Sequence, residues 1–207
     1  MSGQCCQNQP TFDGASTGFK RALWWVIAIN GVMFVVEMIA GRIGESQALQ
    51  ADALDFFADT ITYGLSLYVI GMSIKVRSSI ALLKGFSLAG MGLWVLGSTV
   101  YQTFNPSLPQ AEVMGLIGFL ALLANALSVL LLVRYRNGDA NVRSAWLCSR
   151  NDAIGNVAVM LAGSGVWVTH SAWPDLAVAS LMAGLFFWSA VQIIRLAYAE
   201  SRQAASS

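Results

Sequence analysis

Hydrophobic residues in this chain fall into six long runs separated by short polar turns. Each run is long enough for a membrane-spanning helix, which needs about 20 mostly apolar residues. The turns between runs contain helix-ending residues, as at 105–109 and 137–139. The pattern therefore predicts an all-α membrane protein with six transmembrane helices, at about 21–41, 48–73, 80–104, 111–133, 142–168 and 173–195.

The composition agrees with this pattern. The chain has 207 residues, of which 56% are hydrophobic and only 11% are charged, whereas a soluble domain has about 25% charged residues. No basic run is long enough to bind nucleic acid, and residues 1–19 contain no apolar core of a secretory signal. We expect three parts: a flexible cytoplasmic tail (1–19), a six-helix domain (20–196) and a short cytoplasmic tail (197–207).

The distribution of the twelve Lys and Arg residues predicts the orientation. Arg42 stands alone on one side of the predicted helices, and Arg150 lies within the fifth. The rest gather on the side of the two termini: Lys20, Arg21, Lys75, Arg77, Lys84, Arg134, Arg136, Arg143, Arg195 and Arg202. Because cytoplasmic loops carry the excess of basic residues, both termini should be cytoplasmic.

Acidic residues inside the apolar runs provide the candidate chemistry. A carboxylate at the bilayer centre costs roughly 2.5–3.5 kcal/mol even on a lenient scale, so such residues usually bind ions or protons. Asp55 and Asp59 are four residues apart and share one helix face, as do Cys148 and Asp152. Two facing pairs supply the four ligands of a tetrahedral metal site. A cysteine thiolate favours zinc or cadmium over magnesium or calcium.

Metal binding at such a site would release protons, because the ligands must be deprotonated to bind. This linkage predicts exchange of metal for protons. The model has one geometric condition. With every run centred in the bilayer, the two pairs would lie about 10–15 Å apart, so the fifth helix must start near Gly138 or the helices must tilt.

Other polar residues in the runs leave their roles open. Asp52 could cap the second helix or join the site. Glu37 and Asn30 could hold helices together or line the ion path. Arg150 could extend to the cytoplasmic interface or pair with an acid such as Glu37. We expect His170 at the surface. Cys5 and Cys6, in the tail, could capture metal. Ala81, Gly85 and Ala89 form a small-residue seam suited to helix packing or a dimer contact.

The stretches from Asn30 to Gly41 and from Ser46 to Asp59 closely resemble helices 1 and 2 of the cation diffusion facilitator family. Asn125 and the Trp173-Pro174-Asp175 motif are also similar to the family pattern. The resemblance implies a multi-pass exporter of divalent transition metals (zinc, cadmium or cobalt) in the inner cytoplasmic membrane, driven by a proton gradient. It implies no enzyme activity and no permanently bound cofactor.

Carried over by motif position, the metal ligands are Asp55, Asp59, Cys148 and Asp152. The family generally has histidine or aspartate where this chain has Cys148. Its usual C-terminal cytosolic metal-binding domain is expected to be absent here, and a homodimer would then form through transmembrane helices.

Two other functions remain open at this stage. The first is a membrane metal-binding or accessory protein without transport activity. The second is an intramembrane aspartyl protease that uses paired aspartates as acid and base. Against the protease, Asp152 follows Ser-Arg-Asn rather than a glycine-framed motif, and Asp55 and Asp59 already form a pair within one helix.

Overall fold

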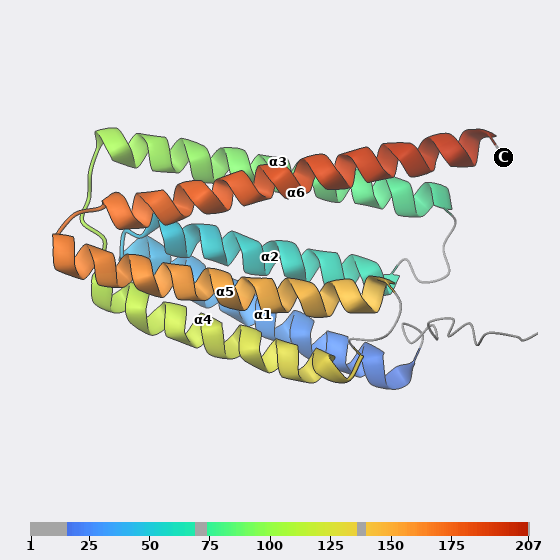
Figure 1. The fold of residues 1–207 in the computed structure, drawn as a ribbon, viewed down its shortest axis with the longest axis horizontal. Coiled ribbons are helices and arrows are strands. Elements are labelled where there is room, and N and C mark those ends of the chain that lie inside the picture. Colours follow the sequence, from blue (N-terminus) through green and yellow to red (C-terminus); the bar gives the residue numbers. More distant parts are fainter. Residues whose placement is uncertain (1–15, 69–73, 136–139, 207) are drawn as a thin grey trace, which may run out of the picture.

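The computed structural model describes residues 16–68, 74–135 and 140–206. Within these ranges the chain consists of helices joined by short turns (Figure 1), which confirms the predicted all-α fold. The start of the first helix and the end of the last lie at the same end of the bundle. The elements are α1 (Thr17–Ile43), α2 (Gln47–Tyr68), α3 (Ile74–Phe104), α4 (Ala111–Leu132), the 3₁₀ turn η2 (Val133–Tyr135), α5 (Ala140–Thr169) and α6 (Trp173–Ser206).

The helix boundaries match the hydrophobic runs, with informative differences. α5 begins at Ala140, close to the Gly138 start that a shared site between α2 and α5 requires. α6 continues as helix to Ser206, through most of the segment 197–207 that was expected to form a tail. The predicted end of the second helix at 73 lies outside the described residues, as do Cys5 and Cys6.

Five helices of the described part are long and apolar enough to cross a membrane: α1, α3, α4, α5 and α6. Their outward faces carry large exposed side chains, including Trp24, Trp94 and Trp188, as expected of surfaces that face lipid. α2 is the exception, because Asp52, Asp55 and Asp59 make it more polar.

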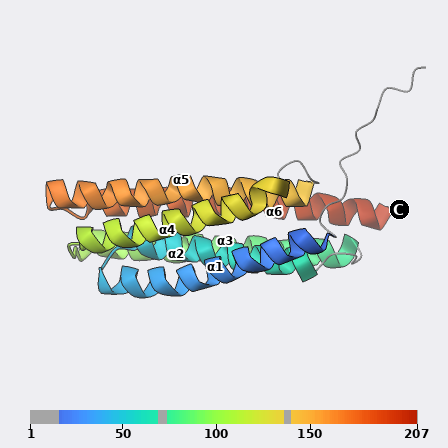
Figure 2. The same cartoon turned by 90° about the horizontal axis from the view of Figure 1, so that it is seen from below.

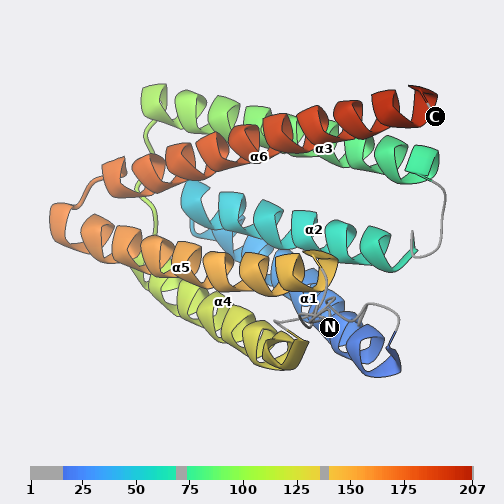
Figure 3. The same cartoon turned by 45° about the vertical axis from the view of Figure 1, so that its right-hand side comes forward.

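α2 occupies the middle of the bundle. Figures 1 and 3 show α3 and α6 together on one side, α1 and α4 on the other, and α2 and α5 between them. Figure 2 shows the same bundle from below, with all the helices running along its length. α2 contacts each of the other five α-helices. Its polar residues are therefore enclosed by protein, the only setting in which several carboxylates are tolerated at membrane depth.

The small-residue seam of α3 packs within the chain. Gly85 is buried against α6 so closely that a Cβ atom there would lie 2.6 Å from Cγ1 of Ile194. Further along, a Cβ on Gly92 would lie 3.3 Å from Cβ of Phe186. Of the two roles that the sequence left open for the seam, close helix packing is the one that the structure supports.

Candidate metal centre

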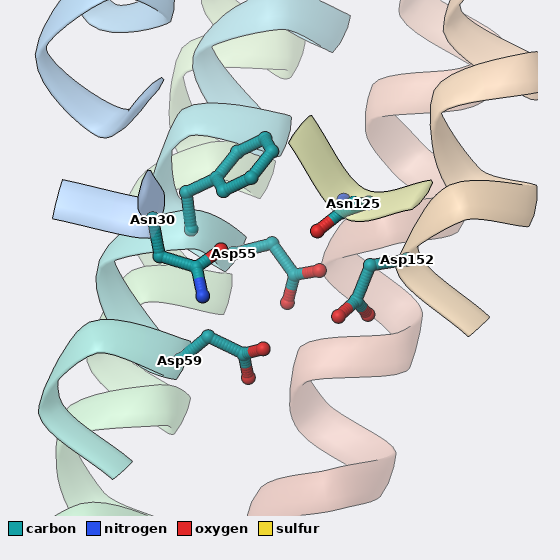
Figure 4. Close-up of a pocket in the computed structure, with 6 residues that line it drawn as sticks. Asn30, Asp55, Asp59, Asn125 and Asp152 are labelled. Carbon is teal, nitrogen blue, oxygen red and sulfur yellow. The ribbon is translucent and has the colours of Figure 1, made fainter. Parts of the chain in front are cut away.

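Two of the α2 aspartates face α5. Asp55 and Asp59 lie one turn apart on the same side of α2, and both side chains are half-buried. Asp152 of α5 is also half-buried and interacts with both of these carboxyl groups. Figure 4 shows the three carboxyl groups pointing into one space between the helices. The structure thus brings together three of the four residues predicted to bind metal.

The space between these side chains forms a small pocket. It is narrow, with essentially no room for a water-sized sphere, and Asn30, Phe56 and Asn125 complete its lining. The pocket therefore draws on α1, α2, α4 and α5. All of its polar lining groups are carboxylates or amides, whose oxygens can bind a cation.

The fourth predicted ligand, Cys148, belongs to α5, but its side chain lies outside the described part of the structure. Among the side chains that are described, no group of three His, Cys, Asp or Glu residues is assembled as a ready-made metal cluster. The carboxylates of Asp55, Asp59 and Asp152 share a pocket without yet converging on one point.

Several buried polar atoms at this pocket have no hydrogen-bond partner among the described residues. These are Oδ2 of Asp59 and both side-chain amide atoms of Asn30. Buried polar groups are almost always hydrogen-bonded, so unpaired ones indicate a missing ligand, ion or water. The donor set and these unpaired atoms fit a site whose occupant is a cation.

Two residues that the sequence did not assign to the site also act on it. The Tyr63 hydroxyl is hydrogen-bonded to the Asp59 carboxyl and lies 3.5 Å from Oγ of Ser149. In the sequence analysis, Lys84 served only as one of the basic residues that predict the membrane orientation. In the structure it is a half-buried residue of α3, and its charge acts on both Asp55 and Asp59. The i, i+4 spacing of Asp59 and Tyr63 was a usable signal, whereas nothing in the sequence pointed from Lys84 to these acids.

A chain of hydrogen bonds leads from the pocket to Asp52. Nδ2 of Asn125 donates to Oδ1 of Asn156 at 2.9 Å, and Nδ2 of Asn156 donates to Oδ2 of Asp52 at 2.7 Å. All three side chains are buried. The sequence analysis did not reveal this link between Asn156 and α2.

Asp175 of α6, rather than Asp52, caps α2. Oδ1 of Asp175 accepts from Oγ of Ser46 at 2.6 Å and from the backbone N–H of Ala48 at 3.0 Å. Oδ2 accepts from the N–H of Gln47 at 2.8 Å. A carboxylate is favoured there by the unpaired N–H groups and the positive end of the helix dipole. This clamp fixes the start of α2, and with it the position of the α2 acids.

The remaining candidates have simpler surroundings. Glu37 is fully buried, and neither carboxylate oxygen has a hydrogen-bond partner among the described residues. Arg150 is exposed, and its guanidinium donates to Oδ1 of Asn151 at 3.4 Å, consistent with the interfacial placement rather than a pair with Glu37. His170 is exposed in the turn before α6, as expected of a surface residue.

The fold and this site define a multi-pass membrane protein with a cluster of carboxylates enclosed among its helices. Residues 23–200 match the cation efflux transmembrane domain, so the chain belongs to the cation efflux family. This confirms the resemblance found in the sequence.

Two relatives show the same likeness. The chain is 25% identical over 179 residues to the metal cation efflux system protein CzcD of Cupriavidus metallidurans. It is also 25% identical over 179 residues to the cation efflux system protein CzcD of an Alcaligenes species. Each alignment covers 80% of this chain and 56% of the relative, so the chain spans just over half the length of the relatives it matches.

Proposed function

We propose that this protein is a transporter of divalent transition-metal ions that exports zinc or cadmium in exchange for protons. The observation that carries the proposal is the placement of Asp55, Asp59 and Asp152 around one pocket inside a bundle of apolar helices. Membership of the cation efflux family and the printed names of the two relatives, both metal or cation efflux system proteins, support it.

In this proposal the metal ion binds between α2 and α5. Asp55 and Asp59 supply oxygen ligands from α2, and Asp152 supplies oxygen from α5. Cys148, one turn before Asp152 on α5, completes a four-ligand set. Closure of the helices around the ion brings the partly exposed carboxylates onto it, and its charge compensates theirs.

Transport then requires the site to open to each side in turn. Rocking of helices around a fixed site is the general route to alternating access. α5 and α2 each supply ligands, so a change in their separation alters both access to the pocket and the fit of the ion. Metal binding releases protons because ligands bind in their deprotonated form, which couples metal export to inward proton flow. We place both termini in the cytoplasm, from the basic residues, and the protein in the inner membrane, as the family resemblance implies.

The test is zinc and cadmium flux into proteoliposomes with an imposed pH gradient. Wild type is compared with Asp59→Asn, Cys148→Ser and the matched control Glu112→Gln, which changes an exposed acid in the first turn of α4. We expect flux in wild type and the control, and at least a tenfold loss in Asp59→Asn, because the ion loses a ligand charge. Cys148→Ser should lower the cadmium-to-zinc ratio, since the softer ion depends more on sulfur.

Binding measured by calorimetry separates the outcomes. Metal binding without flux in correctly inserted wild type would refute transport and favour the metal-binding or accessory role. Equal flux in wild type and Asp59→Asn would place the metal elsewhere.

A further inference from the structure

Glu37 is a buried acid that the metal pocket does not use. Its exposed fraction is 0%, and both carboxylate oxygens are buried without a hydrogen-bond partner among the described residues. An ionised carboxylate is strongly disfavoured in such surroundings unless a donor or cation accompanies it. Glu37 therefore needs either a proton or a bound cation.

The groups around Glu37 favour the proton. α1 packs against α2 and α4. From α2, the charged groups that act on Glu37 are the carboxyls of Asp52 and Asp55. The sole ionisable residue of α4 is Glu112, which is exposed in the first turn, and Arg42, five residues along α1, is exposed as well. The facing groups are thus acids, and among the described residues no three His, Cys, Asp or Glu side chains are placed to hold a metal ion together.

Asp52 is suited to share that proton. It is buried and a neighbour of Glu37 on the adjacent helix. Its Oδ2 already accepts a hydrogen bond from Asn156 at 2.7 Å. This bond stabilises the carboxylate form of Asp52, which can accept a further hydrogen bond. A protonated Glu37 can then donate its O–H to the remaining oxygen of Asp52, so that the pair holds one proton between two carboxyl groups.

This pair is separate from the metal pocket but linked to it. Asn30, which lines the pocket, precedes Glu37 by two helical turns on α1, a rise of about 10 Å. The link runs through Asn156 and Asn125, since Asn156 bonds both Asp52 and Asn125 and Asn125 lines the pocket. The charge in the pocket therefore acts on the pair without contact.

We propose that Glu37, paired with Asp52, is a proton-carrying site for the metal exchange, distinct from the metal ligands. The inference rests on the proposed function and deepens it. With the pocket empty, the pair holds one proton as Glu37–COOH and Asp52–COO⁻. When a divalent cation binds in the pocket, its field favours the doubly ionised pair. The Glu37 O–H bond then breaks, its electron pair stays on the carboxylate, and the proton leaves to water.

The test uses the full chain in proteoliposomes and compares Glu37→Gln with Glu112→Gln. Glutamine mimics the neutral acid and can still donate to Asp52, but it has no acidic proton to release. In Glu37→Gln we expect zinc affinity within about threefold of wild type and intact zinc–zinc exchange at equal pH. Acceleration of zinc flux by a pH gradient should fall at least tenfold, and fewer protons should be released for each zinc bound. Glu112→Gln should match wild type in every readout.

Infrared spectroscopy supplies a readout that does not depend on transport. Wild type without metal should show the carbonyl band of a buried protonated carboxylic acid. Zinc should abolish the part of that band that comes from Glu37, and Glu37→Gln should lack this part. A wild type that transports no zinc would refute the proposed function. The carbonyl band would still show whether Glu37 is protonated.

Three results would overturn the inference: unchanged proton coupling in Glu37→Gln, a carbonyl band in this variant identical to that of wild type, or loss of zinc binding along with coupling. The last would make Glu37 part of the metal site or of the folded core. If Glu37→Gln does not fold, Glu37→Asp, which retains an acid, provides the infrared comparison instead. Its carbonyl band should then shift in frequency, and an unshifted band would equally overturn the assignment.

Discussion

Replacing Asp175 with alanine removes the acceptor of three hydrogen bonds that hold the start of α2 against α6. The donors are Oγ of Ser46 and the backbone N–H groups of Gln47 and Ala48, at 2.6, 2.8 and 3.0 Å. Asp175 itself is fully buried, so little water is available to replace it. The variant tests whether this clamp stabilises the helix that carries the candidate metal ligands.

The expected loss follows from these contacts. A hydrogen bond to a charged group contributes about 1.5–3 kcal/mol, and a buried donor left unpaired costs about 1–3 kcal/mol. The hydroxyl of Ser46 can turn to another acceptor, and contributions within one network are not additive. We therefore expect Asp175→Ala to lower the free energy of unfolding by about 3–5 kcal/mol. Asp175→Asn keeps an acceptor oxygen and should lose about half as much, because charge-assisted bonds are roughly twice as strong as neutral ones.

The assay is equilibrium unfolding in detergent micelles, combined with amide hydrogen exchange at Gln47 and Ala48. Exchange at these two amides should accelerate in Asp175→Ala more than at residues in the middle of α4. The control is Glu112→Ala, which also removes an acid from the first turn of a helix but at an exposed position. It should change stability by no more than about 0.5 kcal/mol.

A double-mutant cycle with Ser46→Ala tests the network directly. Because Ser46 donates to Asp175 and accepts from the N–H of Leu49 at 3.1 Å, the two substitutions should couple by about 0.5–3 kcal/mol. The reasoning is refuted if Asp175→Ala unfolds within about 0.5 kcal/mol of wild type and leaves exchange at Gln47 and Ala48 unchanged.

Two further predictions concern packing and the buried amides. Gly85→Ala should cost about 1–3 kcal/mol of stability, since its Cβ would lie 2.6 Å from Ile194. Gly90→Ala, whose Cβ would have nothing within 4 Å, should be neutral or raise stability by up to about 1 kcal/mol. Equal effects of the two substitutions in thermal unfolding would contradict this packing. Asn156→Leu should destabilise by about 1–3 kcal/mol, because it leaves the buried Oδ2 of Asp52 without the hydrogen bond from Asn156. An unfolding midpoint equal to wild type would show that the amide chain is not formed.

The sequence was most informative where the relevant spacing lies within one helix. The hydrophobic runs located the helices, since a membrane span must bury its backbone hydrogen bonds within one apolar segment. The i, i+4 rule placed Asp55 and Asp59 on one face without knowledge of their partner. The helical rise per residue set the condition that the fifth helix start near Gly138 or the helices tilt, and α5 starts at Ala140.

The sequence was least informative where the partners come from distant helices. The clamp joins Asp175 to Ser46, 129 residues away, and Asn156 reaches Asp52 across 104 residues. The sequence left open that Asp52 caps the second helix, yet Asp52 lies in the amide network and Asp175 caps α2. Which acid took which role depended on the contact between α2 and α6.

By itself, the sequence determined the helical class, the membrane setting, the family and the faces on which the acids lie. The family followed from the resemblance of its motifs, and the other three depend on hydrophobicity and on the period of a single helix. Only the tertiary structure decided that Asp152 meets Asp55 and Asp59, that Asp175 holds the start of α2, and that Glu37 lies buried without a hydrogen-bond partner among the described residues. Those facts depend on the rotation and axial offset of one helix against another, which are set by side-chain packing over the whole bundle rather than by any local pattern.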